Sequence, residues 1–196
     1  KIDYEIDSSS VSPVTRDTYA YWSFDEGSGT KAYDYGFNDP YFGSGSAGPG
    51  RLDLILQNGP EWVPGISGTA LQFDGDDDFL YSDLEQDIDN YETSTYELFF
   101  KTEAEQNQTL LGVCKYQTQY NCGTFQNHDL EIIITADGRL GFRYEAHDNP
   151  SNDLPQILSE ESFNDGFWHH VAVIISNGAN FGSGDRIALY ADGELV

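Results

Sequence analysis

Residues 74–78 (DGDDD) place four aspartates around one glycine in a single short turn. Carboxylate oxygens are the hard ligands that Ca²⁺ takes in sets of about six to eight, and Gly75 permits a tight bend. The spacing is not that of an EF-hand, because the terminal Glu is missing. We therefore expect calcium here, with a solvated acidic turn as the alternative. The candidate ligands, two of them from the preceding loop, are Asp25, Asp34, Asp74, Asp76 and Asp78.

A second candidate site lies in residues 116–125, where aromatic side chains alternate with Gln and Asn. Aromatic faces stack on the C–H surfaces of sugars and amides hydrogen-bond their hydroxyl groups, but the same mixture suits a protein–protein contact. The other reading is a polar surface hairpin that binds nothing. The candidate ligand-binding residues, the last from a neighbouring loop, are Tyr116, Tyr120, Phe125 and His147.

The two cysteines of the chain, Cys114 and Cys122, are close together beside predicted strands. A local pair of this kind predicts a disulfide that closes a hairpin loop, with two unpaired thiols as the alternative. So short a loop would contribute roughly 2.5 kcal/mol in the chain-entropy model. Asn107 opens an Asn-Gln-Thr sequon, a glycosylation site in an oxidising secretory compartment. Together with the acidity, these features indicate a secreted or cell-surface protein.

The charge of the chain limits its partners. Thirty-four acidic residues against nine Lys and Arg give a net charge of −25 over 196 residues. This balance argues against nucleic acid and against anionic membranes as partners. No apolar run is long enough to cross a bilayer, so membrane insertion is not expected. A saline habitat, calcium coordination and a solubility coat are the three explanations of the acidity.

Short alternating runs between turn residues predict an all-β fold. Asp137-Gly138 and Asp192-Gly193 predict two hairpins. The expected strands cover residues 19–24, 52–56, 70–73, 79–81, 96–101, 109–115, 130–135, 140–144, 169–176 and 186–190.

Domain organisation follows from the same pattern. Residues 1–18 are expected to be a polar linker, and residues 19–196 one antiparallel β-sandwich, or jelly roll. The chain stops at Val196 inside its last hairpin, so we expect closing strands beyond it.

Three blocks of sequence resemble the laminin-G-like family, within the concanavalin A-like lectin and glucanase superfamily. They are residues 21–29 (YWSFDEGSG), 68–79 (GTALQFDGDDDF) and 165–172 (DGFWHHVA), the last followed by 189–193 (LYADG). The resemblance implies a jelly-roll sandwich used for binding or adhesion, in which calcium sites are common. The family's closing strands would follow Val196.

The third block contains a histidine pair. Neighbouring residues of a strand point to opposite faces, so His169 and His170 cannot bind one metal together. We expect one to be buried beside Trp168 and the other to lie on the open face.

The superfamily also contains glucanases, so catalysis must be considered. Residues 85–89 (EQDID) imitate the alternating carboxylates with which such enzymes hold a nucleophile and an acid about 5 Å apart. However, Gln86 interrupts the apolar face of a catalytic strand, and Asp replaces the final Glu. No nucleophile elbow or phosphate-binding loop is present either. We expect no enzyme, with action on a polysaccharide as a minor alternative.

These patterns predict a secreted or cell-surface module that binds a glycan or an extracellular glycoprotein, with calcium as the expected cofactor. The alternative is a structural domain of a surface assembly or extracellular filament, whose partners are other copies or subunits.

Overall fold

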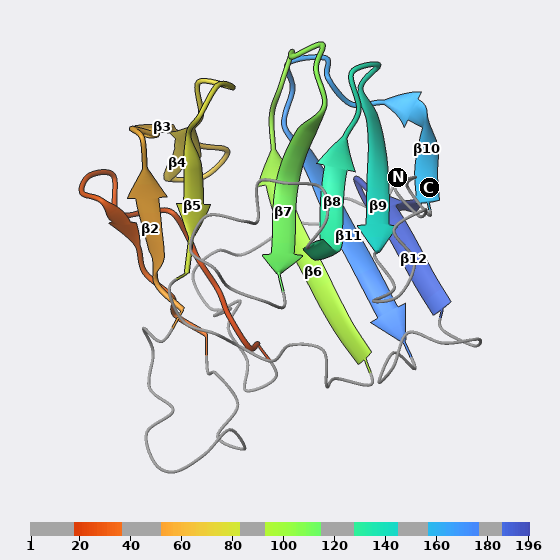
Figure 1. Ribbon diagram of the computed structural model, residues 1–196, viewed down its shortest axis with the longest axis horizontal. Helices are drawn as coiled ribbons and strands as arrows, with labels where there is room; N and C mark the ends of the chain where they lie inside the picture. Colours follow the sequence, from red (N-terminus) through yellow and green to blue (C-terminus); the bar gives the residue numbers. More distant parts are fainter. Residues whose placement is uncertain (1–17, 37–51, 83–92, 115–127, 145–156, 177–185) are drawn as a thin grey trace, which may run out of the picture. The chain divides into compact units, whose positions relative to one another are not determined.

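The computed structural model describes residues 18–36, 52–82, 93–114, 128–144, 157–176 and 186–196 (Figure 1). All regular structure in these ranges is β-strand, and every strand pair is antiparallel. The all-β antiparallel prediction is therefore confirmed. The chain forms two compact units, residues 1–84 and 85–196, each described by itself below.

Unit 1 contains a three-stranded sheet and a separate hairpin. The sheet has the order β1-β2-β5, and β3 pairs with β4. The strands are β1 (Lys31–Ala32), β2 (Leu54–Gln57), β3 (Glu61–Pro64), β4 (Thr69–Gln72) and β5 (Phe79–Tyr81).

Unit 2 contains two four-stranded sheets. The front sheet has the order β10-β9-β8-β7, a meander, and the back sheet has the order β13-β12-β11-β6. Figure 1 shows them as two layers, with β7, β8 and β9 in front of β6, β11 and β12. The strands are β6 (Thr93–Phe100), β7 (Gln108–Cys114), β8 (His128–Ile134), β9 (Arg139–Tyr144), β10 (Ile157–Ser162), β11 (His169–Ser176), β12 (Arg186–Ala191) and β13 (Glu194–Leu195).

The two sheets of unit 2 share one buried core, built by period-two alternation. Every second residue of β8 and of β11 points into it, while the residues between point away. Both sheets contribute large aliphatic and aromatic side chains. The principal members are Phe100, Leu130, Ile132, Ile134, Leu140, Phe142, Phe163, Val171, Val173, Ile175 and Leu189. This arrangement is compatible with the predicted sandwich, and its jelly-roll ordering stays a prediction.

The predicted strands agree with the observed ones in most places. The ranges 79–81 and 169–176 match β5 and β11 to the residue. The expected strand over 19–24 is wrong, because that segment pairs only through one bridge between Trp22 and Asp34. The short strand β1 and the strands β3 and β10 were not anticipated.

Both predicted Asp-Gly hairpins are present. Asp192 and Gly193 have φ values of 49° and 85°, the pair of left-handed residues that a two-residue type I′ turn requires. At the other hairpin Gly138 has φ 82° and donates its N–H to the Thr135 carbonyl at 2.8 Å. The turn between β12 and β13 therefore returns the chain into the back sheet, as expected.

Candidate functional site

The acidic turn between β4 and β5 brings three carboxylates together. Asp74, Asp77 and Asp78 each offer an oxygen, and these oxygens lie within 4.8 Å of one another. The turn closes on its own aspartates, because Asp74 Oδ1 accepts the Asp76 N–H at 2.8 Å and Asp78 Oδ2 accepts the Asp74 N–H at 3.0 Å. The Asp76 amide, followed by those of its neighbours, lowers the pKa of Asp74. The backbone amides of the turn therefore favour the ionised form of Asp74.

A polar hollow of about 330 Å³ adjoins this turn. Asn58 fixes one side of it by donating Nδ2 to the Asp77 carbonyl at 2.6 Å. Oxygen atoms from the β2–β3 connection, from strands β3 and β4 and from the acidic turn thus line one space, a set of ligands that suits a hard cation. The hollow is lined by Asn58, Gly59, Glu61, Gln72, Asp74 and Asp78. Calcium here stays a prediction from the sequence, with Asp77 rather than Asp76 in the group.

Asp34 has a different environment from the other predicted ligands. It is only 1% exposed. Its Oδ1 accepts the N–H groups of Tyr21 and Gly36 at 3.0 and 2.8 Å, and its Oδ2 accepts that of Leu52 at 3.3 Å. The carboxylate therefore joins three chain segments. Asp25 is exposed and accepts the Thr69 N–H at 3.2 Å. Neither belongs to the three-carboxylate group found among the described residues.

Several predicted site residues lie outside the described residues: Tyr116, Tyr120, Phe125, His147, Cys122 and the glucanase-like segment 85–89. Cys114 is the last residue of β7. Because Cys122 is outside the described residues, the disulfide stays a prediction. Asn107 is exposed in the turn before β7, and its Oδ1 accepts the Ala136 N–H at 2.8 Å. The sequon is therefore at the surface.

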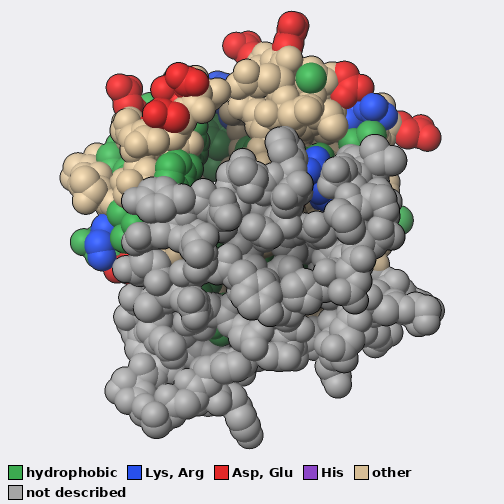
Figure 2. Space-filling model, in the orientation of Figure 1, with side chains coloured by type: hydrophobic (Ala, Val, Ile, Leu, Met, Phe, Trp, Pro, Cys, Tyr) green, Lys and Arg blue, Asp and Glu red, His purple; other side chains and the backbone are tan. Residues whose placement is uncertain are grey.

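In the upper part of Figure 2, where the described residues are coloured, carboxylates stand singly or in small groups. This distribution is the one expected of a solubility coat.

His169 is held by two carboxylates at the start of β11. Its Nδ1 lies 2.8 Å from Asp192 Oδ2, and its Nε2 lies 3.0 Å from Asp165 Oδ1. The side chain is 12% exposed and packs against the rings of Phe100 and Phe163, with centroids 5.8 and 5.2 Å away. Both ring nitrogens are engaged, so this imidazole acts as a clamp between two turns.

The charges in this cluster support one another. Burial lowers the pKa of His169, but the hydrogen bonds to Asp192 and Asp165 outweigh it, and the pKa is raised. The hydrogen bond to His169 is the main reason that the pKa of Asp165 is lowered. Burial raises the pKa of Asp192, yet its bonds to His169 and to the His170 N–H leave it lowered. Below the folded pKa of His169, the cluster is an imidazolium between two carboxylates.

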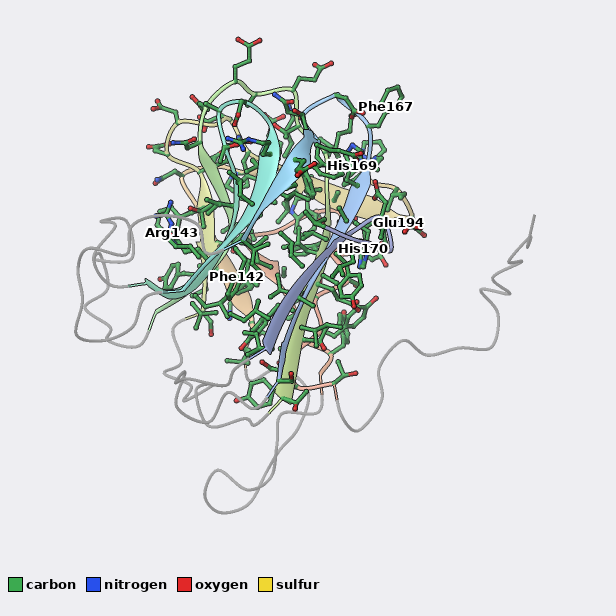
Figure 3. The ribbon with its side chains drawn as sticks, turned by 90° about the vertical axis from the view of Figure 1, so that its right-hand side faces the viewer. Phe142, Arg143, Phe167, His169, His170 and Glu194 are labelled. Carbon is green, nitrogen blue, oxygen red and sulfur yellow. The ribbon has the colours of Figure 1, made fainter. Side chains whose placement is uncertain are left out.

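His170 points away from its neighbour, as predicted (Figure 3). Its ring lies 4.8 Å from the ring of Phe99, and its Nε2 is 3.6 Å from Glu97 Oε2. These contacts lie on the side of the back sheet that is turned away from the core, here called the back face.

The back face mixes apolar and polar positions, with an exposed apolar side chain at each edge. Phe99 is 56% exposed at one edge and Leu195 is 67% exposed at the other. Register places Leu195 opposite Tyr190, Tyr190 opposite Ala172, and Ala172 opposite Glu97, so these side chains cross the sheet in one row. The remaining positions of this face, in neighbouring rows, are Thr93, Thr95, His170, Ile174, Ser176, Arg186 and Ala188.

This surface was not predicted from the sequence, although the composition of two strands indicates it. β11 runs without interruption through VAVII and β12 through IALYA, so both strands are apolar on both faces. Such continuous runs are typical of strands that are covered on both sides. One side of each strand lies in the core, and the other is the back face.

The outer side of the front sheet is built differently. Glu131 and Arg143 stand opposite each other on β8 and β9, and their side chains form an ion pair of 3.2 Å. The Thr109 hydroxyl lies 3.5 Å from Glu131. On the same side Ile133 is buried, and its side chain and that of Leu158 both lie over Gly141. The outer side of the front sheet therefore carries both charged and apolar groups.

The comparisons with known proteins assign no family. No protein-family model matches the chain, and no curated protein matches it. Among solved structures, an S-layer domain-containing protein from Clostridium thermocellum (residues 221–444) is similar, with 23% sequence identity and a TM-score of 0.47. The match covers 92% of this chain and 71% of that chain. Similarity at this level identifies neither the function nor the partners of the chain. Within the described ranges, no helix is long and apolar enough to cross a membrane.

Proposed function

We propose that this chain is a structural domain of an extracellular or cell-surface assembly, joined to its neighbours through the back face of unit 2. The observation that carries the proposal is that β11 and β12 are apolar on both sides, whereas only one side of each lies in the core. A partner on the back face would give these strands the two-sided cover that their sequence favours.

The size of the exposed side chains supports an interaction surface. Phe99 and Leu195 are more than half exposed on the back face, with Tyr190 and Ile174 partly exposed between them. Soluble monomers rarely expose contiguous apolar patches beyond a few hundred Å², and larger ones mark contact sites. Burial of apolar surface contributes roughly 25 cal/mol per Å², so covering this patch would stabilise an assembly.

Recognition of a glycan or glycoprotein, and the absence of catalysis, stay predictions from the sequence. The aromatic and amide residues that motivated glycan binding fall in segment 116–125, outside the described residues. Among the described residues, the back face gives a protein contact the more specific support.

Hydroxyl-radical footprinting tests the proposed function. The full chain would be labelled once in isolation and once in the native assembly from the organism that makes it. We expect Phe99, Tyr190 and Leu195 to be modified in isolation and protected in the assembly. Phe73 of unit 1, which is 44% exposed, is the internal control and should react equally in both. Equal modification of the back face in both samples would overturn the proposal.

A further inference from the structure

We infer that the His169 clamp is a one-sided pH switch. When the imidazole becomes neutral, it releases the turn before β11, residues 165–168, and keeps its hold on the turn between β12 and β13. This inference does not depend on the proposed function. It rests on a difference between the two carboxylates that hold the ring, because Asp192 is fixed by backbone bonds that Asp165 lacks among the described contacts.

Asp192 has three connections to the segment that carries the ring. Its Oδ2 lies 2.8 Å from His169 Nδ1, and its Oδ1 accepts the His170 N–H at 2.8 Å. Its own N–H is donated to the His170 carbonyl at 2.9 Å. The last two bonds join β11 to the turn between β12 and β13 whatever the charge of the imidazole. The Nδ1 side of the ring therefore keeps a carboxylate beside it wherever Asp192 is ionised.

Asp165 offers one oxygen to two donors. Its Oδ1 lies 3.0 Å from His169 Nε2 and also accepts the Phe167 N–H at 2.9 Å. The turn is attached to the segment after β6 as well, because the Gly166 N–H is donated to the Thr102 carbonyl at 3.0 Å. Phe167 is 71% exposed, and Figure 3 shows it above His169 on the loop that leads into β11. Packing of this side chain therefore contributes little to holding the turn in place.

These contacts decide which nitrogen of a neutral ring keeps the proton. A neutral imidazole has one N–H, and a proton on Nδ1 preserves the bond to Asp192. Nε2 then presents a lone pair to Asp165 Oδ1, and two acceptors at this distance repel each other. The other tautomer would set the lone pair against Asp192, whose backbone bonds prevent it from moving away. The Nδ1–H tautomer is therefore favoured, and Asp165 is the partner that moves.

The charged groups around the ring act in the same direction. Asp165 and Asp192 are the carboxylates whose charges raise the pKa of His169, and the side chain of Glu103 lies over Gly166 in the released turn. The remaining charged or titratable residues of the segments packed against the ring, which have no described contact with it, are Glu97, Lys101, Glu160, Glu161, His170 and Glu194. Loss of the imidazolium charge leaves Asp165 between carboxylates, so repulsion adds to the loss of its hydrogen bond.

Nitrogen NMR of the full chain between pH 5 and 9 tests the tautomer directly. Below the folded pKa of His169 both ring nitrogens should carry a proton. Above it we expect the proton on Nδ1 and a lone pair on Nε2. The measurement needs no variant, so a variant that fails to fold cannot obscure the result. A neutral ring with its proton on Nε2 would overturn the inference.

Amide hydrogen exchange tests which turn opens. After correction for the intrinsic effect of pH, Gly166 and Phe167 should lose protection at least about tenfold as the ring becomes neutral, because a hydrogen bond to a charged group is lost. The amides of His170 and Asp192 should keep their protection. His169→Gln should remove the pH dependence, whereas His170→Gln, the matched control on the back face, should retain it. Equal loss of protection at both turns, or no change at Gly166 and Phe167, would show that the clamp is not a one-sided switch.

Discussion

His169 Nδ1 lies 2.8 Å from Asp192 Oδ2, so the first residue of β11 is tied to the turn between β12 and β13. The other ring nitrogen binds Asp165 in the turn before β11. A neutral imidazole has one N–H and can donate to only one carboxylate, whereas an imidazolium donates to both. The integrity of this clamp therefore depends on the charge of one histidine.

The clamp predicts a pH window for stability. Because the pKa of His169 is raised in the folded state, its contribution is fully present below the unfolded value of about 6.5 and is lost as pH rises through the folded pKa. The pKa values of Asp165 and Asp192 are lowered, so their contribution is present above about 4 and is lost as pH falls through the folded values. The cluster should stabilise the fold most between about pH 4 and 6.5.

Urea unfolding of the wild type and of His169→Gln between pH 4 and 9 measures this contribution. We expect the wild type to be more stable than the variant by about 1 to 3 kcal/mol near pH 5.5, with the difference shrinking above pH 7. His170→Gln is the control, since that ring lies on the back face near Glu97. Parallel pH profiles for the wild type and His169→Gln would contradict the assignment.

Two glycines with similar backbone conformations should lose different amounts of stability when each is replaced by alanine. Gly138 and Gly193 have φ values of 82° and 85°, so alanine is strained at both. A Cβ at position 193 meets nothing within 4 Å, but one at position 138 would clash with Asn164 Oδ1. Asn164 cannot move freely, because it donates Nδ2 to the Ala104 carbonyl.

Gly193→Ala should therefore cost about 1 kcal/mol, whereas Gly138→Ala should cost about 2 to 4 kcal/mol from strain and overpacking together. Chemical unfolding of the two variants makes the comparison. Equal losses would show that backbone strain alone governs both turns.

The strands that sequence reasoning found are those whose cause is local. β11 follows from its continuous apolar run. The turn between β12 and β13 follows from the Asp192-Gly193 pair, which dictates the type of turn. β3 was missed because Pro60 precedes it and Pro64 is its last residue, and the strand forms through pairing with β4. β10 was missed because its sequence is polar. Its Ser159 is buried and accepts the Leu140 N–H, a contact across 19 residues that no local pattern reveals.

The candidate sites likewise combine features that neighbouring residues predict with contacts between distant residues that they do not predict. Composition indicated an acidic turn, but which aspartates converge depends on backbone hydrogen bonds inside the turn, and the structure groups Asp77 rather than Asp76 with Asp74. Asp34 was expected at the same site, yet folding brings Tyr21, Gly36 and Leu52 around it. The carboxylates that hold His169 come from two turns whose meeting depends on strand register. Residue type was thus predictable, whereas long-range partners were not.

Asp34 is predicted to be a structural carboxylate of unit 1. In Asp34→Asn an NH₂ group replaces one acceptor oxygen, so at least one of the three backbone N–H groups loses its partner in a buried site. We expect a loss of about 1 to 3 kcal/mol, and faster hydrogen exchange at the amides of Tyr21, Gly36 and Leu52. Asp25→Asn, at an exposed carboxylate that accepts one N–H, should change stability by less than about 1 kcal/mol. Unchanged exchange at the three amides would refute this role.

The calcium prediction can be tested with two neighbouring aspartates. If calcium binds the group that the structure brings together, the chain should unfold at a higher temperature in calcium than in chelator. The free energy of unfolding should rise by roughly 2.7 kcal/mol at a hundredfold excess of calcium over Kd. Asp77→Asn should abolish this gain, because it removes one of the three converging carboxylates. Asp76→Asn should retain it, because Asp76 is outside the group while the substitution removes the same charge from the same turn. Loss of the gain in Asp76→Asn alone would favour the ligand set expected from the sequence. No calcium effect in the wild type would leave the turn as part of the acidic coat.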